Sequence, residues 1–308
     1  MKLLVIPFAA FLAFPNANAQ APEVADSTGL PGDHFSLQGA LELFKNANDL
    51  EQFETALNTE SNQVNNLDLD GNGEIDYVRV TSQKEGDAVV IMLRVPVSKE
   101  ETQDVAVIEL EKTGEESAIL QIRGDEDLYP AETIIEPFAE TEAIKEGKGP
   151  FAPEIIGVQV VVNVWGWSCP RWCFSARYYP WDSPWYWGYY PGWWRPWHPH
   201  PWRAWHGWGH RYHAWYRPWN SCRVVHAHRI YGPRRMHSQY VRNRYKEAHV
   251  RHAAARPART IKPDRTPKQG PKTVRPKRTS PRKVAPRPTP KGSPKTTRPP
   301  RAKGKKGR

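Results

Sequence analysis

The sequence predicts an α+β fold: two N-terminal helices packed on an antiparallel β-meander, followed by a Trp/Pro/His-rich low-complexity region and a disordered basic tail. One observation behind this prediction is the apolar spacing, which changes from helical to alternating after Asn58. A second is charge: residues 1–164 hold 30 of the 33 acidic side chains and a net charge of −20, whereas residues 165–308 carry +31. A third is that all 14 tryptophans lie within residues 165–219. We therefore expect an acidic folded module joined to a basic, aromatic extension.

The N-terminal residues 1–19 have the form of a secretory signal peptide. A positive start precedes an apolar run over residues 3–14, and small residues at 17–19 suit cleavage before Gln20. This run is too short to span a bilayer of about 30 Å, and no later apolar run reaches about eighteen residues. We expect an exported protein, periplasmic, at the cell surface or extracellular, with no transmembrane span and at most peripheral membrane contact.

Residues 20–35 are expected to form a polar linker, and two helices follow it. Ser36 is suited to cap the first helix. Apolar residues then recur at helical spacing: Leu37, Ala40, Leu41, Phe44 and Ala47. Asp49 and Gln52 form a capping box for the second helix. Its apolar stripe consists of Leu50, Phe53, Ala56 and Leu57.

Four runs of β-branched and apolar residues, separated by turn residues, predict the strands of the module, which we place at residues 36–128. The runs cover residues 77–80, 88–97, 105–110 and 118–122. Their short connections favour sequential antiparallel pairing, with both helices on one face of the sheet. Residues 129–164 are expected to form an acidic connector, with a short helix over 133–145 and a strand over 155–164.

An oxygen-rich segment lies where the helices give way to the strands. Gly73 at its sixth position permits a sharp turn, and Glu74 at the seventh would contribute its backbone carbonyl. Calcium prefers about six to eight oxygen ligands, and carboxylates packed this closely repel each other without a cation. The segment therefore predicts a structural calcium site; an Asx-rich turn without an ion is the alternative. Side-chain ligands at positions 1, 3, 5 and 9 are Asp68, Asp70, Asn72 and Asp76.

This segment resembles the calcium loops of EF-hand proteins over about twelve residues. It departs from them at position 12, where Arg79 stands in place of the bidentate glutamate. The continuation through Tyr77 and Val78 is similar to the calcium-binding hairpin loops of FG-GAP repeats in integrin α propellers. The resemblance implies a weak site, with a dissociation constant of about 10⁻⁴ to 10⁻³ M, that stabilises rather than senses. The motif occurs once in the sequence, so a propeller is not implied.

Residues 165–222 form a Trp/Tyr/His-rich region in which frequent prolines exclude long helices and central strands. Four interpretations remain open for it. The rings could stack on sugars or nucleobases, lie at a membrane interface, drive self-association, or pack together as a low-complexity surface segment. Export argues against nucleic acid as the main partner.

Histidines in this region are candidate ligands for a second metal. The spacings of His206 with His210 and of His210 with His213 suit copper, nickel or zinc if a helical turn forms, although Gly207 and Gly209 weaken a helix. The candidate set is His198, His200, His206, His210 and His213.

Three cysteines are candidates for disulfide bonding in an exported chain: Cys169, Cys173 and Cys222. A bridge from either of the first two to Cys222 would close a loop of about fifty residues and stabilise the region by about 4 kcal/mol in the chain-entropy model. The remaining thiol could link two molecules, and the sequence leaves the connectivity open.

Basic residues dominate the C-terminal part of the chain. Residues 223–252 form a basic segment with an expected helix from about Met236, and residues 253–308 contain 20 basic side chains against Asp264 alone. Like charges and frequent prolines predict a disordered tail. Its composition is similar to linker-histone tails, but the expected export favours an anionic surface as partner, with a merely solubilising tail as the alternative. The polyanion-binding candidates are Lys277, Arg278, Arg282, Lys283, Lys303, Lys305 and Lys306.

Common catalytic motifs do not occur in the sequence, and the module has no cysteine. We expect an exported, non-enzymatic binding or structural protein. Its calcium-stabilised module would be tethered to an anionic envelope, glycan or matrix surface by the aromatic region and the basic tail. The alternatives are a His-rich transition-metal-binding protein and a membrane-active cationic protein.

Overall fold

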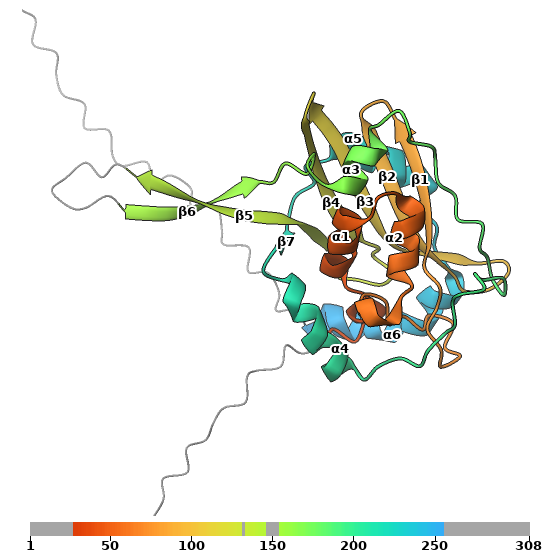
Figure 1. Cartoon of the computed structure of the whole chain (residues 1–308). Helices are drawn as coiled ribbons and strands as arrows, with labels where there is room; N and C mark the ends of the chain where they lie inside the picture. Colours follow the sequence, from red (N-terminus) through yellow and green to blue (C-terminus); the bar gives the residue numbers. More distant parts are fainter. Residues whose placement is uncertain (1–26, 131–132, 146–153, 256–308) are drawn as a thin grey trace, which may run out of the picture. The chain divides into compact units, whose positions relative to one another are not determined.

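The computed structural model describes residues 27–130, 133–145 and 154–255. An antiparallel sheet with six strands in chain order confirms the predicted α+β fold and its meander (Figure 1). The strands are β1 (Arg79–Glu85), β2 (Ala88–Pro96), β3 (Thr102–Gly114), β4 (Ser117–Gly124), β5 (Ile134–Lys145) and β6 (Glu154–Val161). A seventh strand, β7 (Tyr216–Trp219), pairs with β5. The expected signal peptide over residues 1–19 and the expected tail beyond Ala255 lie outside the described residues.

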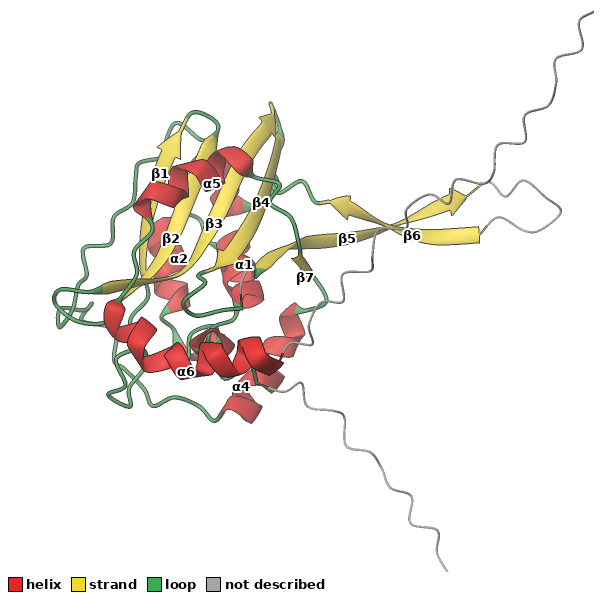
Figure 2. Ribbon diagram, turned by 180° about the vertical axis from the view of Figure 1, so that it is seen from behind, coloured by secondary structure: helices red, strands yellow, loops and turns green. Residues whose placement is uncertain are grey.

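Helices cover both faces of the sheet. The elements α1 and α2 lie on one face and α5 on the other, as Figures 1 and 2 show from opposite sides. Side chains of β2 alternate accordingly: Val89 and Ile91 belong to the main core under α1 and α2, whereas Val90 and Met92 pack under α5. The α-helices are α1 (Leu37–Asn46), α2 (Leu50–Leu57), α3 (Ser168–Cys173), α4 (Trp202–Gly209), α5 (Val225–Tyr231) and α6 (Gln239–Ala255). Short 3₁₀ turns are η1 (Pro31–His34), η2 (Glu60–Asn62), η3 (His210–Tyr212) and η4 (Gly232–Arg234).

The predicted helix caps are present. The Ser36 hydroxyl accepts a hydrogen bond from the Gly39 amide at 3.0 Å, and the Asp49 carboxylate accepts one from the Gln52 amide at 2.8 Å. The Gln52 side chain accepts from the Asn48 amide, one residue before the partner that a capping box uses. Both helices therefore begin where side-chain oxygens satisfy their free amide groups. Helix α6 confirms the helix expected near Met236.

Two local predictions were wrong. The helix expected over residues 133–145 is instead strand β5 (Ile134–Lys145), whose first residues are paired on both sides: Ile134 faces Arg123 of β4 and Trp219 of β7. Part of the expected linker over residues 20–35 belongs to the fold, since Leu30 and Phe35 are buried in the core. These contacts are distant in sequence, so local spacing did not reveal them.

Residues 165–222, which we call the aromatic belt, fold back over the module instead of extending from it. Helix α3 packs against α1. The belt then continues the sheet at the β1 edge: the Ser82 amide donates to the Trp181 carbonyl at 2.7 Å, and the Ser183 amide donates to the Val80 carbonyl at 3.1 Å. The expectation of a non-globular extension is thereby corrected, because backbone pairing at a free sheet edge needs no aliphatic side chains.

The indoles of the belt divide between interior and surface. Trp194 and Trp205 are buried, whereas Trp193 is 52% and Trp215 is 64% exposed. The other ten are half-buried, and four of these pack against the main core: Trp165, Trp167, Trp172 and Trp181. Within the described residues, no helix combines the length and apolar character needed to cross a membrane.

Opposite charges of the two halves pair within the fold. Arg235, between α5 and α6, forms ion pairs with three successive carboxylates after β4, at 2.6 Å to Asp125, 2.5 Å to Glu126 and 3.2 Å to Asp127. Arg242 of α6 also reaches Asp127, at 2.9 Å. Part of the positive charge of the rear half is thus used to hold that half on the acidic module.

All three cysteines are free thiols in the structure. Cys169 and Cys173 are buried in the main core beside α1, whereas Cys222 packs against the cluster under α5, on the opposite face of the sheet. The predicted bridge to Cys222 is therefore not formed here, because the sheet lies between the two positions. Burial raises the pKa of the Cys169 and Cys222 thiols.

Candidate metal centre at the acidic loop

The acidic loop, residues 68–76, joins η2 to β1 and curls around its first carboxylate. Asp68 accepts hydrogen bonds from two amides of its own loop, Gly71 at 2.7 Å and Gly73 at 3.1 Å. Both glycines have positive φ, 76° and 85°, which side-chain-bearing residues rarely adopt. The glycines thus let the chain turn tightly enough to bring the later carboxylates back to Asp68.

Three carboxylates converge in this loop. Asp68, Asp70 and Asp76 each offer an oxygen atom, and these atoms lie within 4.8 Å of one another. Asp76 is 7% exposed and accepts a hydrogen bond from the Leu69 amide at 2.5 Å. Burial, reinforced by the neighbouring carboxylates, raises the pKa of Asp76 well above its usual range and raises that of Asp70. A divalent cation among the three oxygens would offset this repulsion.

The other two predicted ligands are not part of this triad. Asn72 is exposed, with its side-chain amide donating to Asp70 at 3.0 Å and its side-chain oxygen accepting from the Glu74 amide at 2.7 Å. The Glu74 side chain is also exposed, in keeping with a role for its backbone alone. Arg79, at the twelfth position, donates to the Ser183 carbonyl of the belt at 2.7 Å and so supplies no ligand.

The belt and α6 both attach to the backbone of this loop. Two belt residues contact the loop backbone. The Trp197 carbonyl accepts a hydrogen bond from the Ile75 amide at 2.8 Å, and His198 Nδ1 lies 2.8 Å from the Gly73 carbonyl oxygen. From α6, the Tyr240 hydroxyl donates to the Asp70 carbonyl at 2.7 Å. These partners, 122 or more residues away in sequence, could not be predicted from the loop motif.

Arg244 of α6 covers the same loop. Its guanidinium lies so close to Gly71 that a side chain at position 71 would collide with it. Arg244 also lowers the pKa of Asp70, although burial of that carboxyl has the larger, opposite effect. The Tyr245 hydroxyl, one residue further on, is 3.4 Å from the Asp68 carbonyl oxygen. The acidic loop is therefore the place where module, belt and C-terminal helix meet.

The helical turn on which the histidine spacing depends does form, in α4 and η3, despite Gly207 and Gly209. It brings three imidazoles side by side, with ring centroids 4.9 Å apart for His206 and His210, and 4.7 Å apart for His210 and His213. Burial, followed by the like charge of His210, lowers the pKa of His206 and His213. His198 and His200 lie elsewhere, at the acidic loop and beside Glu60.

In the part of the chain that the structure describes, two groups of three donor atoms are close enough to hold a metal ion. One is the aspartate triad, and the other is Glu109, Cys222 and His228. The tract of His206, His210 and His213 is not among them. The second group is not among the sites predicted from the sequence, because its glutamate comes from β3, more than a hundred residues before its cysteine. The six-residue spacing of Cys222 and His228 was the available signal.

Comparison with protein-family models, curated proteins and solved structures finds no match to this chain. The class of this protein is therefore described from its fold and its candidate metal site alone. It is an α+β module with a carboxylate-lined loop that could hold a metal ion, wrapped by an aromatic segment with exposed tyrosine and tryptophan clusters.

Proposed function

We propose that this protein is an exported, non-enzymatic binding protein in which a calcium-stabilised module presents a cationic tail to an anionic polymer of the cell envelope or extracellular matrix. The observation that carries the proposal is the convergence of Asp68, Asp70 and Asp76 beneath helix α6. Carboxylate and carbonyl oxygens are the ligands that calcium prefers. The same loop anchors the belt and α6, so an ion there would stabilise the attachment of both.

The distribution of charge favours the tail as the binding segment. Residues 27–255 contain 30 acidic and 23 basic side chains, a net charge of −7, whereas residues 256–308 contain 20 basic side chains and one acidic one, a net charge of +19. Residues 27–255 therefore repel polyanions on average, and residues 256–308 attract them. The candidates for this role are Lys277, Arg278, Arg282, Lys283, Lys303, Lys305 and Lys306, which lie outside the described residues.

The first experiment measures calcium binding to the mature chain, beginning at Gln20. With a dissociation constant of about 10⁻⁴ to 10⁻³ M, about 10 mM calcium should raise the melting temperature by about 3–8 °C. Asp70→Asn should abolish the rise by removing a ligand charge from a half-buried position. Asp87→Asn, at an exposed turn, is the matched control and should keep it. An equal rise in both variants, or none in the parent chain, rejects the calcium site.

The second experiment measures retention on heparin as a model anionic polymer. The mature chain should elute only at high salt, because each neutralised charge adds to the salt dependence. A chain ending at Ala255 keeps every described element and should flow through. Retention that survives this truncation would contradict the tail as the binding segment. Leakage of anionic liposomes would instead support the membrane-active alternative, and cell fractionation tests export.

A further inference from the structure

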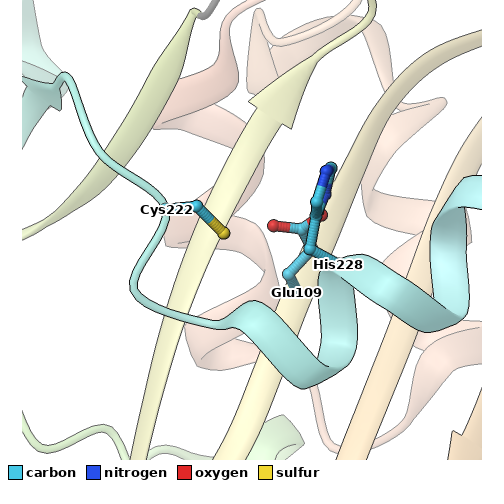
Figure 3. Close-up of side chains that lie close together, drawn as sticks. All are labelled: Glu109, Cys222 and His228. Atoms are coloured by element: carbon cyan, nitrogen blue, oxygen red, sulfur yellow. The ribbon is translucent and has the colours of Figure 1, made fainter.

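A second candidate metal site lies on the face of the sheet opposite α1 and α2. Glu109 projects from β3, Cys222 lies in the segment before α5, and His228 lies on α5; Figure 3 shows the three side chains directed toward one another. Each offers one donor atom, and the three atoms lie within 4.8 Å of one another. We refer to them as the Glu/Cys/His cluster.

The carboxylate of Glu109 is buried without being fully satisfied. The side chain is 0% exposed, and His228 Nδ1 lies 2.6 Å from one of its oxygens. Within the described residues the other oxygen, Oε2, has no hydrogen bond; it forms an ion pair at 3.6 Å with Arg123 Nη2, which is also without a hydrogen bond. A buried carboxylate oxygen without a hydrogen bond costs free energy, and an ion pair at this distance offsets only part of that cost.

Specific hydrogen bonds hold the other two donors over Glu109. Gln121, directly opposite Glu109 on β4, donates to the Ser221 carbonyl at 3.0 Å and accepts from the Arg223 amide at 2.8 Å. Cys222 lies between these two anchors. Glu111, two residues after Glu109 on the same strand, accepts from the Ala227 amide at the start of α5 at 2.7 Å. The sheet therefore positions both the cysteine and the histidine.

We propose that Glu109, Cys222 and His228 bind a divalent transition metal, with zinc as the chemical class that fits best. One thiolate, one imidazole and one carboxylate are all established zinc ligands. The thiolate and carboxylate together balance the charge of the ion. The thiol releases its proton to solvent on binding, and Glu109 gains a metal–oxygen bond in addition to its ion pair with Arg123.

Metal–ligand bonds of about 2.0–2.3 Å place tetrahedral donors about 3.3–3.8 Å apart. The three donor atoms lie within 4.8 Å of one another, so small side-chain adjustments are needed, including opening of the 2.6 Å hydrogen bond between His228 Nδ1 and Glu109. His228 is 44% exposed at its side chain and Cys222 is half-buried, which leaves both free to adjust. A cavity of about 230 Å³ lies beside the cluster; it is lined by His228 and Arg123 but not by Glu109 or Cys222.

The test uses cobalt as a spectroscopic probe on the freshly reduced mature chain. Thiolate ligation produces a near-ultraviolet charge-transfer band, which should saturate at one equivalent of cobalt and disappear on addition of zinc. Cys222→Ser should abolish the band, and His228→Ala should weaken zinc binding at least about tenfold. Glu109→Gln, which keeps the shape and removes the charge, should weaken it in the same direction.

Matched controls separate this cluster from the other candidates. His226→Ala changes an exposed histidine of the same helix and should leave the band unchanged. Combined replacement of His206, His210 and His213 by alanine should also leave it unchanged. A band that persists in Cys222→Ser, or that is absent from the parent chain, overturns the proposal. Unchanged melting of Cys222→Ser without metal verifies that the variant folds. The cobalt test of the Glu/Cys/His cluster is independent of calcium binding at the acidic loop, because calcium gives no charge-transfer band.

Discussion

At the scale of single residues, Glu54 shows how the belt is joined to the core. This glutamate of α2 is buried, and each of its carboxylate oxygens accepts two hydrogen bonds. The donors are the Tyr77 hydroxyl, the Ser183 hydroxyl, the Trp181 indole and the Val80 amide. Two of them come from the belt, one from β1 and one from the segment just before β1. A charged residue on an amphipathic helix is normally solvated, so this role of Glu54 could not be predicted from local sequence.

We expect Glu54→Ala to lower the free energy of unfolding by about 3–5 kcal/mol, because it leaves four donors without an acceptor in a buried site. Glu54→Gln should cost less than half as much, since the two hydroxyls can rotate and accept from the new amide. Urea denaturation of both variants measures the difference. Equal losses would show that the acceptor network contributes little.

Protonation of Glu54 should also make stability depend on pH. Burial raises its pKa, with the four hydrogen bonds acting in the opposite direction, so the folded state holds this proton more tightly than the unfolded chain. Its contribution is therefore complete below the unfolded pKa of about 4.3 and declines as the pH rises through the folded pKa. The stability of the parent chain relative to Glu54→Gln should be greater at about pH 4 than at about pH 7. Chemical denaturation at both pH values checks the sign, and a difference that grows toward neutral pH contradicts it.

At the scale of elements, the contact between the acidic loop and α6 can be tested by conformational strain. Gly71 and Gly73 both have positive φ, but only Gly71 lies against Arg244. Apart from the chain neighbours of Gly73, no atom of the described residues lies within 4 Å of a side-chain position there. The two glycines therefore form a matched pair. Both need a backbone with positive φ, but only Gly71 is also in contact with the Arg244 guanidinium of α6.

Gly73→Ala should cost about 1 kcal/mol of stability through backbone strain alone. Gly71→Ala should cost more, because the guanidinium of Arg244 must also move. In an Arg244→Ala background the two glycine variants should become equal. Thermal or urea melts of this double-mutant cycle measure the coupling. Additive effects would mean that Arg244 does not pack on the loop.

At the scale of the whole molecule, the belt and the C-terminal helices complete the core. Tyr212 and Tyr216 of the belt and Val241 of α6 belong to the main core cluster. The second cluster needs Ile230 and Tyr231 of α5 to cover Met92. Opposite charge then draws the rear of the chain onto the front, through pairs such as Arg235 with Asp125.

A chain covering residues 20–164 should consequently fail to fold cooperatively. It loses the cover of one sheet face and several buried residues of the other, so we expect binding of a hydrophobic dye and a weak near-ultraviolet circular dichroism signal. The chain ending at Ala255 is the control, and its melting temperature should match that of the mature chain. A sharp unfolding transition in the shorter chain would show that residues 36–164 form an independent domain.

The sequence by itself determined the features that depend on near neighbours. Helix caps at Ser36 and Asp49, the alternating strands and the aspartate spacing of the acidic loop all follow from chain positions a few residues apart. Tertiary structure alone decided the path of the belt, the strand character of residues 134–145 and the meeting of Glu109 with Cys222 and His228. The path of the belt depends on the free edge of the sheet at β1, and the strand over residues 134–145 depends on pairing with β4 and β7. The Glu/Cys/His cluster depends on packing between segments that are distant in sequence. No local pattern encodes such contacts, because their energy arises only when the partners come together.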